Sequence, residues 1–241
     1  MKKIIFKPIK PKDASTLIII KNDKKNTCVL MGQRSMKSRF MPGVFVFPGG
    51  AIEKDDSTAF KFFKLKANKA ISKKALKSYS NIHSQSLLLA AIRETAEETG
   101  LYLAKKQKNP IKSFINSDST WHDFTEKSFL PSTDKLFFFG RAITPSKLKI
   151  RFHARFFLAF YDDFIGKVKT NGELNDISWL SLKEAKKKKM ADVTEFMLDE
   201  IIKLNNNFSN LLNKKDFPMF TWRNNKRWIK WDKINNIKRF Q

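Results

Sequence analysis

The sequence predicts an α/β fold in which short strands precede and follow one long acidic helix. Three observations predict it: Ile- and Phe-rich runs separated by polar turns in residues 14–47, helical periodicity across residues 84–99, and alternating apolar residues across residues 151–160. The chain has 241 residues and 41% of them are apolar, which is enough for a sizeable core. We expect a single domain over residues 1–241, with additions, rather than two small domains.

The first strands are expected to form a hairpin that leads into a glycine turn. Ala14–Ile20 is rich in Ile and is predicted to be a buried strand, and a polar turn separates it from a second strand at Thr27–Gly32. A basic loop then precedes a short third strand at Val44–Phe47. The adjacent Gly49 and Gly50 follow, and glycines here allow the backbone to approach a ligand closely.

The central part of the chain is predicted to be helical. Ser84–Thr99 has apolar residues along one face and carboxylates off to its side, as in an amphipathic helix. Ser57–Leu76 places Phe and Leu at helical spacing among lysines, which predicts one or two amphipathic helices. Residues 110–131 have a less regular pattern.

The second half of the chain returns to strands and then to helices. Alternation and apolar runs predict strands at Leu136–Ile143, Arg151–Phe160 and Ile177–Leu180. Helices are predicted at Leu182–Lys189 and Val193–Leu204. The stretch 222–240 is basic and rich in Trp. We expect it to pack on the domain because exposed Trp side chains are costly, the alternative being a tail that binds nucleic acid or a membrane surface.

Three carboxylates gather near the end of the long helix. On a helix, Glu94 shares a face with Glu97 and Glu98, at spacings of three and four residues. Like charges this close repel one another, and a hard divalent cation such as Mg²⁺ or Mn²⁺ would convert the repulsion into coordination. Arg93 can bond the carboxylate of Glu97 four residues on, and Gly100 can end the helix in a left-handed C-cap. The alternative is a solvated acidic turn.

The glycine turn and the acidic helix together resemble the Nudix box, the signature of the Nudix hydrolases. Gly50 matches the first glycine of that pattern, and Asp56 stands where the first Glu is expected. The second half of the pattern is matched by Arg93, Glu94, Glu97, Glu98, Gly100 and Leu101, with a mild departure at Thr95. The halves are separated by 36 residues where the pattern has seven, so an insert of 29 residues, 57–85, divides the box.

The resemblance implies a fold, a reaction and a cofactor. The fold would be the Nudix α/β/α sandwich around a central mixed sheet, with a helical insert inside the box, extra C-terminal helices and a basic Trp-rich extension over residues 205–241. The reaction would be hydrolysis of a diphosphate linkage in a nucleoside diphosphate derivative, with Mg²⁺ or Mn²⁺ bound. Carried over by position, Glu94, Glu97, Glu98 and the carbonyl of Gly49 would be metal ligands, with Asp56 an outer member of the cluster.

The same carry-over leaves the catalytic base open. Glu94, Glu97 and Glu173 are the candidates, because the base varies within the family. Glu173 precedes a stretch that resembles a late Nudix segment in which a carboxylate precedes a strand with Trp. Arg93 would orient Glu97 or its neighbours.

Substrate recognition rests on a few basic residues and on the glycine turn. Arg34 and Arg39 lie just ahead of Gly50 and could clamp a diphosphate, or be ordinary surface cations. Arg155 lies within an apolar strand, so its guanidinium needs either a structural acid or a phosphate. The interrupted box and its flanking segments resemble the branch of peroxisomal coenzyme A diphosphatases, which implies CoA or acyl-CoA as substrate. ADP-ribose, dinucleotides and nucleoside triphosphates stay open.

Charge and composition narrow the class of protein. The formal net charge is +25, but lysine outnumbers arginine 39 to 9, a bias that an AT-rich genome produces. Nucleic-acid readers favour Arg, so we do not expect specific nucleic-acid binding. The single cysteine excludes an intrachain disulfide, and no run has the length of a signal peptide or a membrane span. We expect a cytoplasmic protein.

Two other classes of function stay open beside a small-molecule hydrolase. One is a non-catalytic Nudix-like domain, which loss of the acids Glu94, Glu97 and Glu98 would have favoured. The other is an RNA-directed Nudix protein that uses the basic C-terminal stretch. A homodimer is compatible with the Phe-rich composition, although no decisive patch identifies an interface.

Overall fold

The computed structural model describes residues 9–23, 26–68, 71, 73–205, 207–211 and 213–233, and it has the predicted α/β class. A central sheet of nine strands is found among these residues. Its order is β10 (Leu174–Ser181), β2 (Asn26–Arg34), β1 (Lys12–Asp23), β8 (Phe152–Phe160), β7 (Phe137–Ile143), β11 (Asp216–Arg223) and β12 (Lys226–Lys233). Short β3 (Phe45–Val46) pairs with β2, and β4 (Gly49–Ala51) pairs with β1.

The sheet is mixed, as the resemblance implied. β1 runs parallel to β8 and β7 runs parallel to β11, whereas the other neighbours are antiparallel. β1 and β2 form the predicted hairpin. β4 lies beside the first half of β1, and β2 lies beside its second half. The glycine turn is therefore part of the sheet and is fixed next to its centre.

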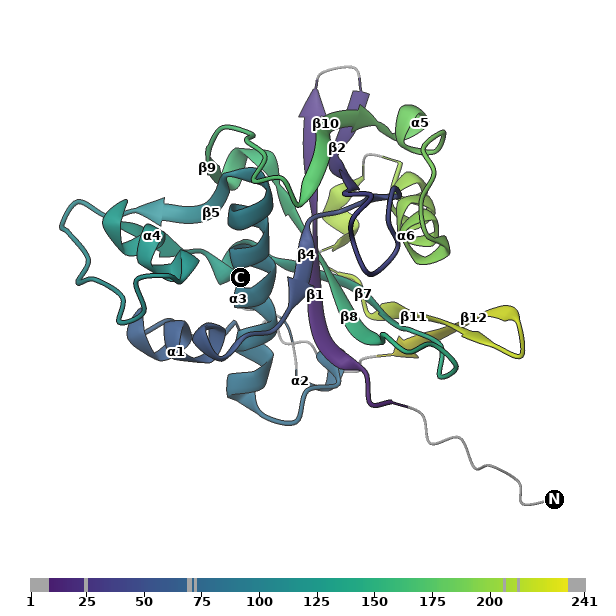
Figure 1. The fold of residues 1–241 in the computed structure, drawn as a ribbon, viewed down its shortest axis with the longest axis horizontal. Helices are drawn as coiled ribbons and strands as arrows, with labels where there is room; N and C mark the ends of the chain where they lie inside the picture. The colour runs from purple at the N-terminus through teal and green to yellow at the C-terminus, as the bar shows by residue number, and fades with distance from the viewer. Residues whose placement is uncertain are drawn as a thin grey trace.

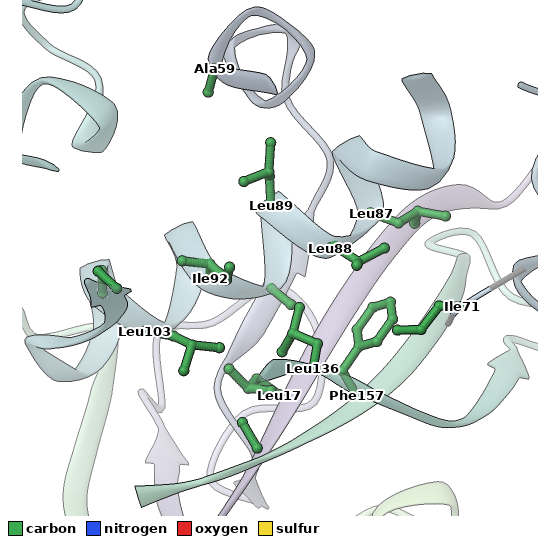
Figure 2. Close-up of a cluster of buried hydrophobic side chains, with 14 of the residues drawn as sticks. Leu17, Ala59, Ile71, Leu87, Leu88, Leu89, Ile92, Leu103, Leu136 and Phe157 are labelled. Atoms are coloured by element: carbon green, nitrogen blue, oxygen red, sulfur yellow. The ribbon is translucent and has the colours of Figure 1, made fainter. Parts of the chain in front are cut away.

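Two helices cover the two faces of this sheet (Figure 1). α3 (Asn81–Thr99) packs on one face, where Leu88 and Ile92 meet Leu17 and Phe157 of the central strands (Figure 2). α6 (Asp192–Lys203) packs on the other, with its Met197 and Leu198 in a second core that includes Ile18. Each face therefore has its own apolar core, because both faces of the central strands are buried.

α3 is buried around almost its whole circumference, which differs from the single apolar face expected for an amphipathic helix. It lies between the central sheet and an outer group made of α1 (Lys54–Phe62), α4 (Thr120–Glu126) and a small sheet (Figure 1). The small sheet has the order β6 (Phe129–Pro131), β5 (Leu101–Lys106) and β9 (Phe164–Gly166). Polar residues of α3 that face this outer group must consequently find partners inside the protein.

The ends of α3 follow ordinary capping rules. The helix begins three residues before the predicted start, because the Ser80 side chain accepts a hydrogen bond from the His83 backbone N–H (3.0 Å). It ends at Gly100, whose φ of +69° is the left-handed conformation predicted for the C-cap. The acidic residues therefore occupy the last two turns of a fixed helix.

The insert contains less helix than expected. α1 begins at Lys54, before the insert, and ends at Phe62, and α2 is a single turn, Lys73–Leu76. Residues 81–85, counted within the insert from the sequence, belong to α3. Residues 69, 70 and 72 lie outside the described residues.

The C-terminal part combines the expected helices with unexpected strands. Two helices are present, α5 (Leu182–Ala185) and α6, but α5 is only one turn long. The extension then forms the antiparallel pair β11 and β12, which joins the central sheet through β7. The Trp-rich stretch thus joins the domain as an edge hairpin as far as residue 233, but most of β12 is exposed and Trp231 is 44% exposed, so the expected burial of the Trp side chains is met only in part. Residues 234–241 lie outside the described residues. The pattern also missed β5, β6, β9 and α4, and 3₁₀ turns occur at Thr133–Lys135, Tyr161–Asp163 and Phe208–Leu211.

Candidate active site

The last two turns of α3 meet the glycine turn at the edge of the central sheet. Helical spacing places Glu94 and Glu98 on the same side of α3, and both side chains reach the short strand β4. The Gly49 N–H donates a hydrogen bond to Glu98 Oε2 (2.9 Å). A Cβ at Gly50 would overlap with the Glu94 carboxylate, so glycine is required for this close approach.

Gly49 is required for a second reason. Its φ is +154°, a conformation that side chains rarely adopt, and a Cβ there would collide with the backbone of Ser15 on β1. Both glycines of the turn are therefore explained by contacts with neighbouring groups, one with backbone and one with a carboxylate.

Arg93 is buried behind the acids and holds several of them in place by hydrogen bonds and ion pairs. It is 1% exposed, and its Nε donates to Asp56 Oδ1 (2.9 Å) while its Nη1 donates to Glu97 Oε2 (3.0 Å). Its Nη2 donates to the Ala51 carbonyl (2.8 Å), which ties the helix to β4. Glu94 Oε1 lies 3.0 Å from Nη1 as well. One guanidinium thus fixes both halves of the divided motif relative to each other.

Asp56 is placed by these contacts away from any position open to a ligand. Its side chain is fully buried, and it accepts hydrogen bonds from Arg93 and from Trp121 Nε1 (3.3 Å). The Glu53 backbone N–H donates to its other oxygen (2.8 Å). The sequence suggested Asp56 as an outer member of the metal cluster. In the structure its oxygens face the protein interior, so it is a positioning residue for Arg93.

The two carboxylates at the glycine turn have raised pKa values. Burial raises the pKa of Glu94 to about 7, although the nearby charge of Arg93 acts in the opposite direction. Burial also raises the pKa of Glu98 to about 8, and repulsion by Glu94 adds to the effect. Titratable groups shifted this far in a cleft are typical of functional sites.

These acids fit a hard divalent cation in their chemistry. Among the described residues, no group of three or more His, Cys, Asp or Glu side chains is arranged as a ready metal site. However, Glu94 and Glu98 are buried side by side and repel one another, and a bound cation would relieve that repulsion. Mg²⁺ accepts one or two carboxylates, which this pair of acids could supply, together with substrate phosphates.

A cavity of about 460 Å³ opens beside the acids, within the size range of small-molecule sites. Glu94, Glu98 and the glycine turn form one end. The remaining wall combines a few polar groups with many apolar ones, and its members include Lys12, Ala14, Thr16, Arg34, Phe40, Met41, Phe47, Ala142, Thr144, Leu148, Phe152, Ala154, Phe156, Glu173, Asp192, Thr194, Phe220 and Trp222.

The structure brings some of the predicted site residues together and separates others. Arg34 and Glu173 lie on the cavity wall with Glu94 and Glu98. Arg34 donates hydrogen bonds to Ser38 Oγ (2.9 and 3.2 Å). Arg39 is exposed and lies outside the wall.

Glu97 also lies outside the wall, since its carboxylate accepts hydrogen bonds from Arg93 and from Thr120 Oγ1. Both oxygens of Glu97 thus accept hydrogen bonds from side chains, whereas Glu98 accepts one from the Gly49 backbone N–H and Glu94 lies 3.0 Å from Arg93 Nη1. As a metal ligand or base, Glu97 would first have to exchange its side-chain partners.

Arg155 has a structural acid as its partner. It is 1% exposed, bonds to Asp13, and donates to the Leu76 carbonyl (3.0 Å). Neighbouring strand residues point to opposite faces, so Ala154 and Phe156 line the cavity while Arg155 faces the α3 side. The sequence left open whether Arg155 pairs with a structural acid or with a phosphate, and the structure supplies the acid. This placement does not support the predicted contact of Arg155 with substrate.

Several cavity residues had no individual signal in the sequence. Phe220 and Trp222 come from β11, which the pattern did not predict as a strand. Thr16 and Lys12 follow from the alternation along β1, once it is known which face of the strand meets the cavity.

Comparison with known proteins agrees with this geometry. No family model matches the chain. A Caenorhabditis elegans protein named nudix hydrolase 7 is 26% identical over 178 residues, which cover 71% of this chain and 51% of that protein. The chain therefore spans about half the length of this curated relative. The name of this relative agrees with the resemblance to Nudix hydrolases found in the sequence.

The solved structures show the fold. A NUDIX hydrolase from Alicyclobacillus acidocaldarius superposes with a TM-score of 0.64 at 20% sequence identity, covering 84% of this chain and 96% of that one. The mixed α/β fold with its central sheet is thus that of the Nudix hydrolase structures. Within the described part of the chain, no helix is both long and apolar enough to cross a membrane.

Proposed function

We propose that this protein hydrolyses a diphosphate linkage in a nucleoside diphosphate derivative with the help of Mg²⁺ or Mn²⁺, and that CoA or acyl-CoA is the substrate. The observation behind the reaction is the pair of buried carboxylates, Glu94 and Glu98, that meets a glycine turn at one end of a 460 Å³ cavity. The choice of CoA rests on the interrupted motif, with its insert between Asp56 and Arg93.

The residues of this chain have distinct roles in the proposed reaction. Glu94 and Glu98, with the Gly49 carbonyl, would hold the cation, which supplies charge stabilisation for phosphoryl oxygens and lowers the pKa of bound water. Arg34 would bind a phosphate oxygen beside them. Arg93 and Asp56 position the helix and its acids without touching substrate.

Two residues compete for the role of general base. Glu94 has a pKa near neutrality, which suits proton transfer at physiological pH. Glu173 lies on the cavity wall close enough to Glu98 for its charge to raise the pKa of that residue. We favour Glu173 if both helical acids bind the cation, because a ligand of the cation is less free to accept a proton.

The direct test is product analysis with a panel of CoA, acyl-CoA, ADP-ribose, a dinucleotide, a nucleoside triphosphate and capped RNA, with Mg²⁺, with Mn²⁺ and with EDTA. Metal-dependent release of 3′,5′-ADP from CoA is the expected result. Hydrolysis of another member alone would retain the reaction and replace the substrate. No turnover of any of them would favour a non-catalytic domain.

Glu98→Gln tests the site itself, because it keeps the shape of the side chain and removes the charge. A loss of several kcal/mol of charge stabilisation corresponds to a fall in kcat of about a hundredfold or more. Glu126→Gln is the matched control, since Glu126 is exposed on α4, outside the cavity wall, and pairs with His122. Equal turnover by both variants would contradict the site assignment. A homodimer and a cytoplasmic location stay predictions from the sequence.

A further inference from the structure

The floor of the cavity is a row of alanines that crosses the central sheet. Strand register places Ala51 of β4 beside Ala14 of β1, Ala14 beside Ala154 of β8, and Ala154 beside Ala142 of β7. The next residue in the row is Phe220 of β11. All five line the cavity. At about 4.8 Å per strand, the four steps give a floor about 19 Å long.

Larger side chains border this floor and close its end. On β8, Phe152 and Phe156 flank Ala154, two residues before and two after it, on the same face of the sheet. Phe220 stands at the far end of the row, and Trp222 follows on the same face of β11. The result is an apolar trough, defined here as Ala51, Ala14, Ala154, Ala142, Phe220 and Trp222. It begins at the carboxylates and ends at the C-terminal strands.

Charge differs between the two ends of the trough. The basic side chains on the cavity wall, Lys12 and Arg34, belong to β1 and β2, on the side of the carboxylates. At the opposite end the charged wall residue is Asp192, whose carboxylate accepts a hydrogen bond from Arg227 of the C-terminal hairpin. Glu94, Glu98 and Glu173 lie at the β1 and β2 end as well, so phosphate groups are favoured there when a divalent cation is held by Glu94 and Glu98 beside Lys12 and Arg34. Among the described residues, the wall segments from β7 and β11 supply no basic group.

We infer that the trough binds the uncharged, extended arm of the conjugate, which for CoA is the pantetheine arm, while the phosphorylated nucleoside lies toward Lys12 and Arg34. A long arm uses the whole floor, whereas a single planar base would cover only part of it. The C-terminal hairpin then determines specificity, because Phe220 and Trp222 close the trough. This inference rests on the proposed function for the identity of the conjugate.

The test measures how the two halves of CoA bind separately, since each half can be titrated without turnover. The probes are 4′-phosphopantetheine and 3′,5′-ADP, measured by calorimetry with Mg²⁺ present. Ala154→Leu fills the floor, and Trp222→Ala opens the end. Each is expected to weaken binding of 4′-phosphopantetheine about tenfold and to leave 3′,5′-ADP unchanged. Trp231→Ala is the matched control, because Trp231 is 44% exposed on the same hairpin and outside the cavity wall.

Kinetics give a second readout on the folded enzyme. KM is measured with acyl-CoAs of increasing chain length. In Trp222→Ala the dependence of KM on chain length is expected to differ from that of the wild type, whereas Trp231→Ala should match the wild type at every length. Titrating both halves of the ligand also controls for misfolding, because loss of folded protein would weaken binding of both halves and not of one alone.

The outcomes separate this inference from the proposed reaction. Loss of 3′,5′-ADP binding with intact 4′-phosphopantetheine binding would overturn the inference and place the nucleoside in the trough. Failure of the wild type to bind 4′-phosphopantetheine would overturn it as well. If Glu98→Gln kept full turnover while the trough variants lost the arm, the active-site assignment would fail and the trough would stand.

Discussion

Two clusters of buried charge lie on the α3 side of the sheet, and they differ in balance. The acid-rich cluster consists of Arg93 with Asp56, Glu94, Glu97 and Glu98. The balanced cluster consists of Asp13, His83, Arg141, His153, Arg155 and Asp232, in which two arginines pair with two aspartates. Only the acid-rich cluster borders the cavity.

The difference shows how burial of charge separates structure from function. In the balanced cluster each arginine has its own carboxylate, as Arg141 has Asp232 at 2.7 Å, so no charge needs an outside partner. In the acid-rich cluster Arg93 pairs with Asp56, Glu94 and Glu97, so three carboxylates share one guanidinium, and Glu98 is a fourth acid beside Glu94. The surplus acids Glu94 and Glu98 line the cavity. A surplus of buried acid is expensive unless a ligand of opposite charge compensates it.

The largest expected effect comes from removing the one cation of the acid-rich cluster. Arg93→Met leaves the fully buried Asp56 unpaired, and we expect unfolding free energy to fall by about 3–5 kcal/mol. Urea unfolding measures it. The double variant Asp56→Leu/Arg93→Met should recover part of the loss. A single variant within about 1 kcal/mol of wild type would show that Asp56 is not held as an ion.

Next in size is a change that moves one acid without unfolding the protein. In Gly50→Ala, the new Cβ would displace the Glu94 carboxylate, the far end of a flexible side chain, so folding should be little affected. Misplacement by about 1 Å costs about a hundredfold in rate, and we expect a fall of this order in kcat. Steady-state kinetics and the unfolding midpoint are measured together. A normal kcat would show that the position of Glu94 is unimportant.

The balanced cluster should respond in stability alone. Arg155→Met removes hydrogen bonds to Asp13 and to the Leu76 carbonyl, and we expect a loss of about 1.5–3 kcal/mol in unfolding free energy. Values of KM should stay unchanged. Arg34→Met is the comparison, since it lies on the cavity wall and should raise KM with little loss of stability. A raised KM in Arg155→Met with unchanged stability would restore its role in substrate binding.

The smallest expected effect is a dependence of folding stability on pH, which differs between the two clusters. Glu94 and Glu98 ionise near pH 4.5 when unfolded, but their pKa values in the folded protein are about 7 and about 8. The unfolded state thus binds fewer protons between these values, so the metal-free protein loses stability as pH rises. Burial lowers the pKa of His153 to about 3, so this residue is neutral in the folded protein, while the unfolded chain loses its proton mostly below about pH 7.5 and offsets only part of the effect of the two acids.

Between pH 6.5 and 8 the melting temperature of the metal-free protein should therefore fall, at about 2–4 °C per kcal/mol. Scanning calorimetry in EDTA measures this fall. Glu98→Gln should flatten the slope, and Mg²⁺ should raise the melting temperature more at pH 8 than at pH 6.5. A slope that is the same in wild type and variant would contradict the raised pKa of Glu98.

Local patterns in the sequence predicted the parts of the site that depend on neighbours along the chain. Helical spacing brought Glu94 and Glu98 to one side of α3, and Gly100 ended the helix where expected. The glycine turn was recognised because glycines let the backbone approach a ligand closely, and in the structure the groups that come this close are the Ser15 backbone and the Glu94 carboxylate. β1, β2, β7 and β8 were recognised from their apolar patterns, although with shorter bounds for β1 and β2.

Contacts between distant segments decided the rest. Asp56 meets Arg93 across 37 positions and Arg155 meets Asp13 across 142, so no local pattern could tell a structural acid from a ligand. The C-terminal strands supply Phe220 and Trp222 to a cavity whose acids lie on α3. The sequence by itself thus predicted three helical acids, Glu94, Glu97 and Glu98, and the glycine turn beside them, and the structure kept two of the acids at the cavity. Only the tertiary structure decided which charges are balanced and which face the cavity, because balance depends on partners that the fold alone brings together.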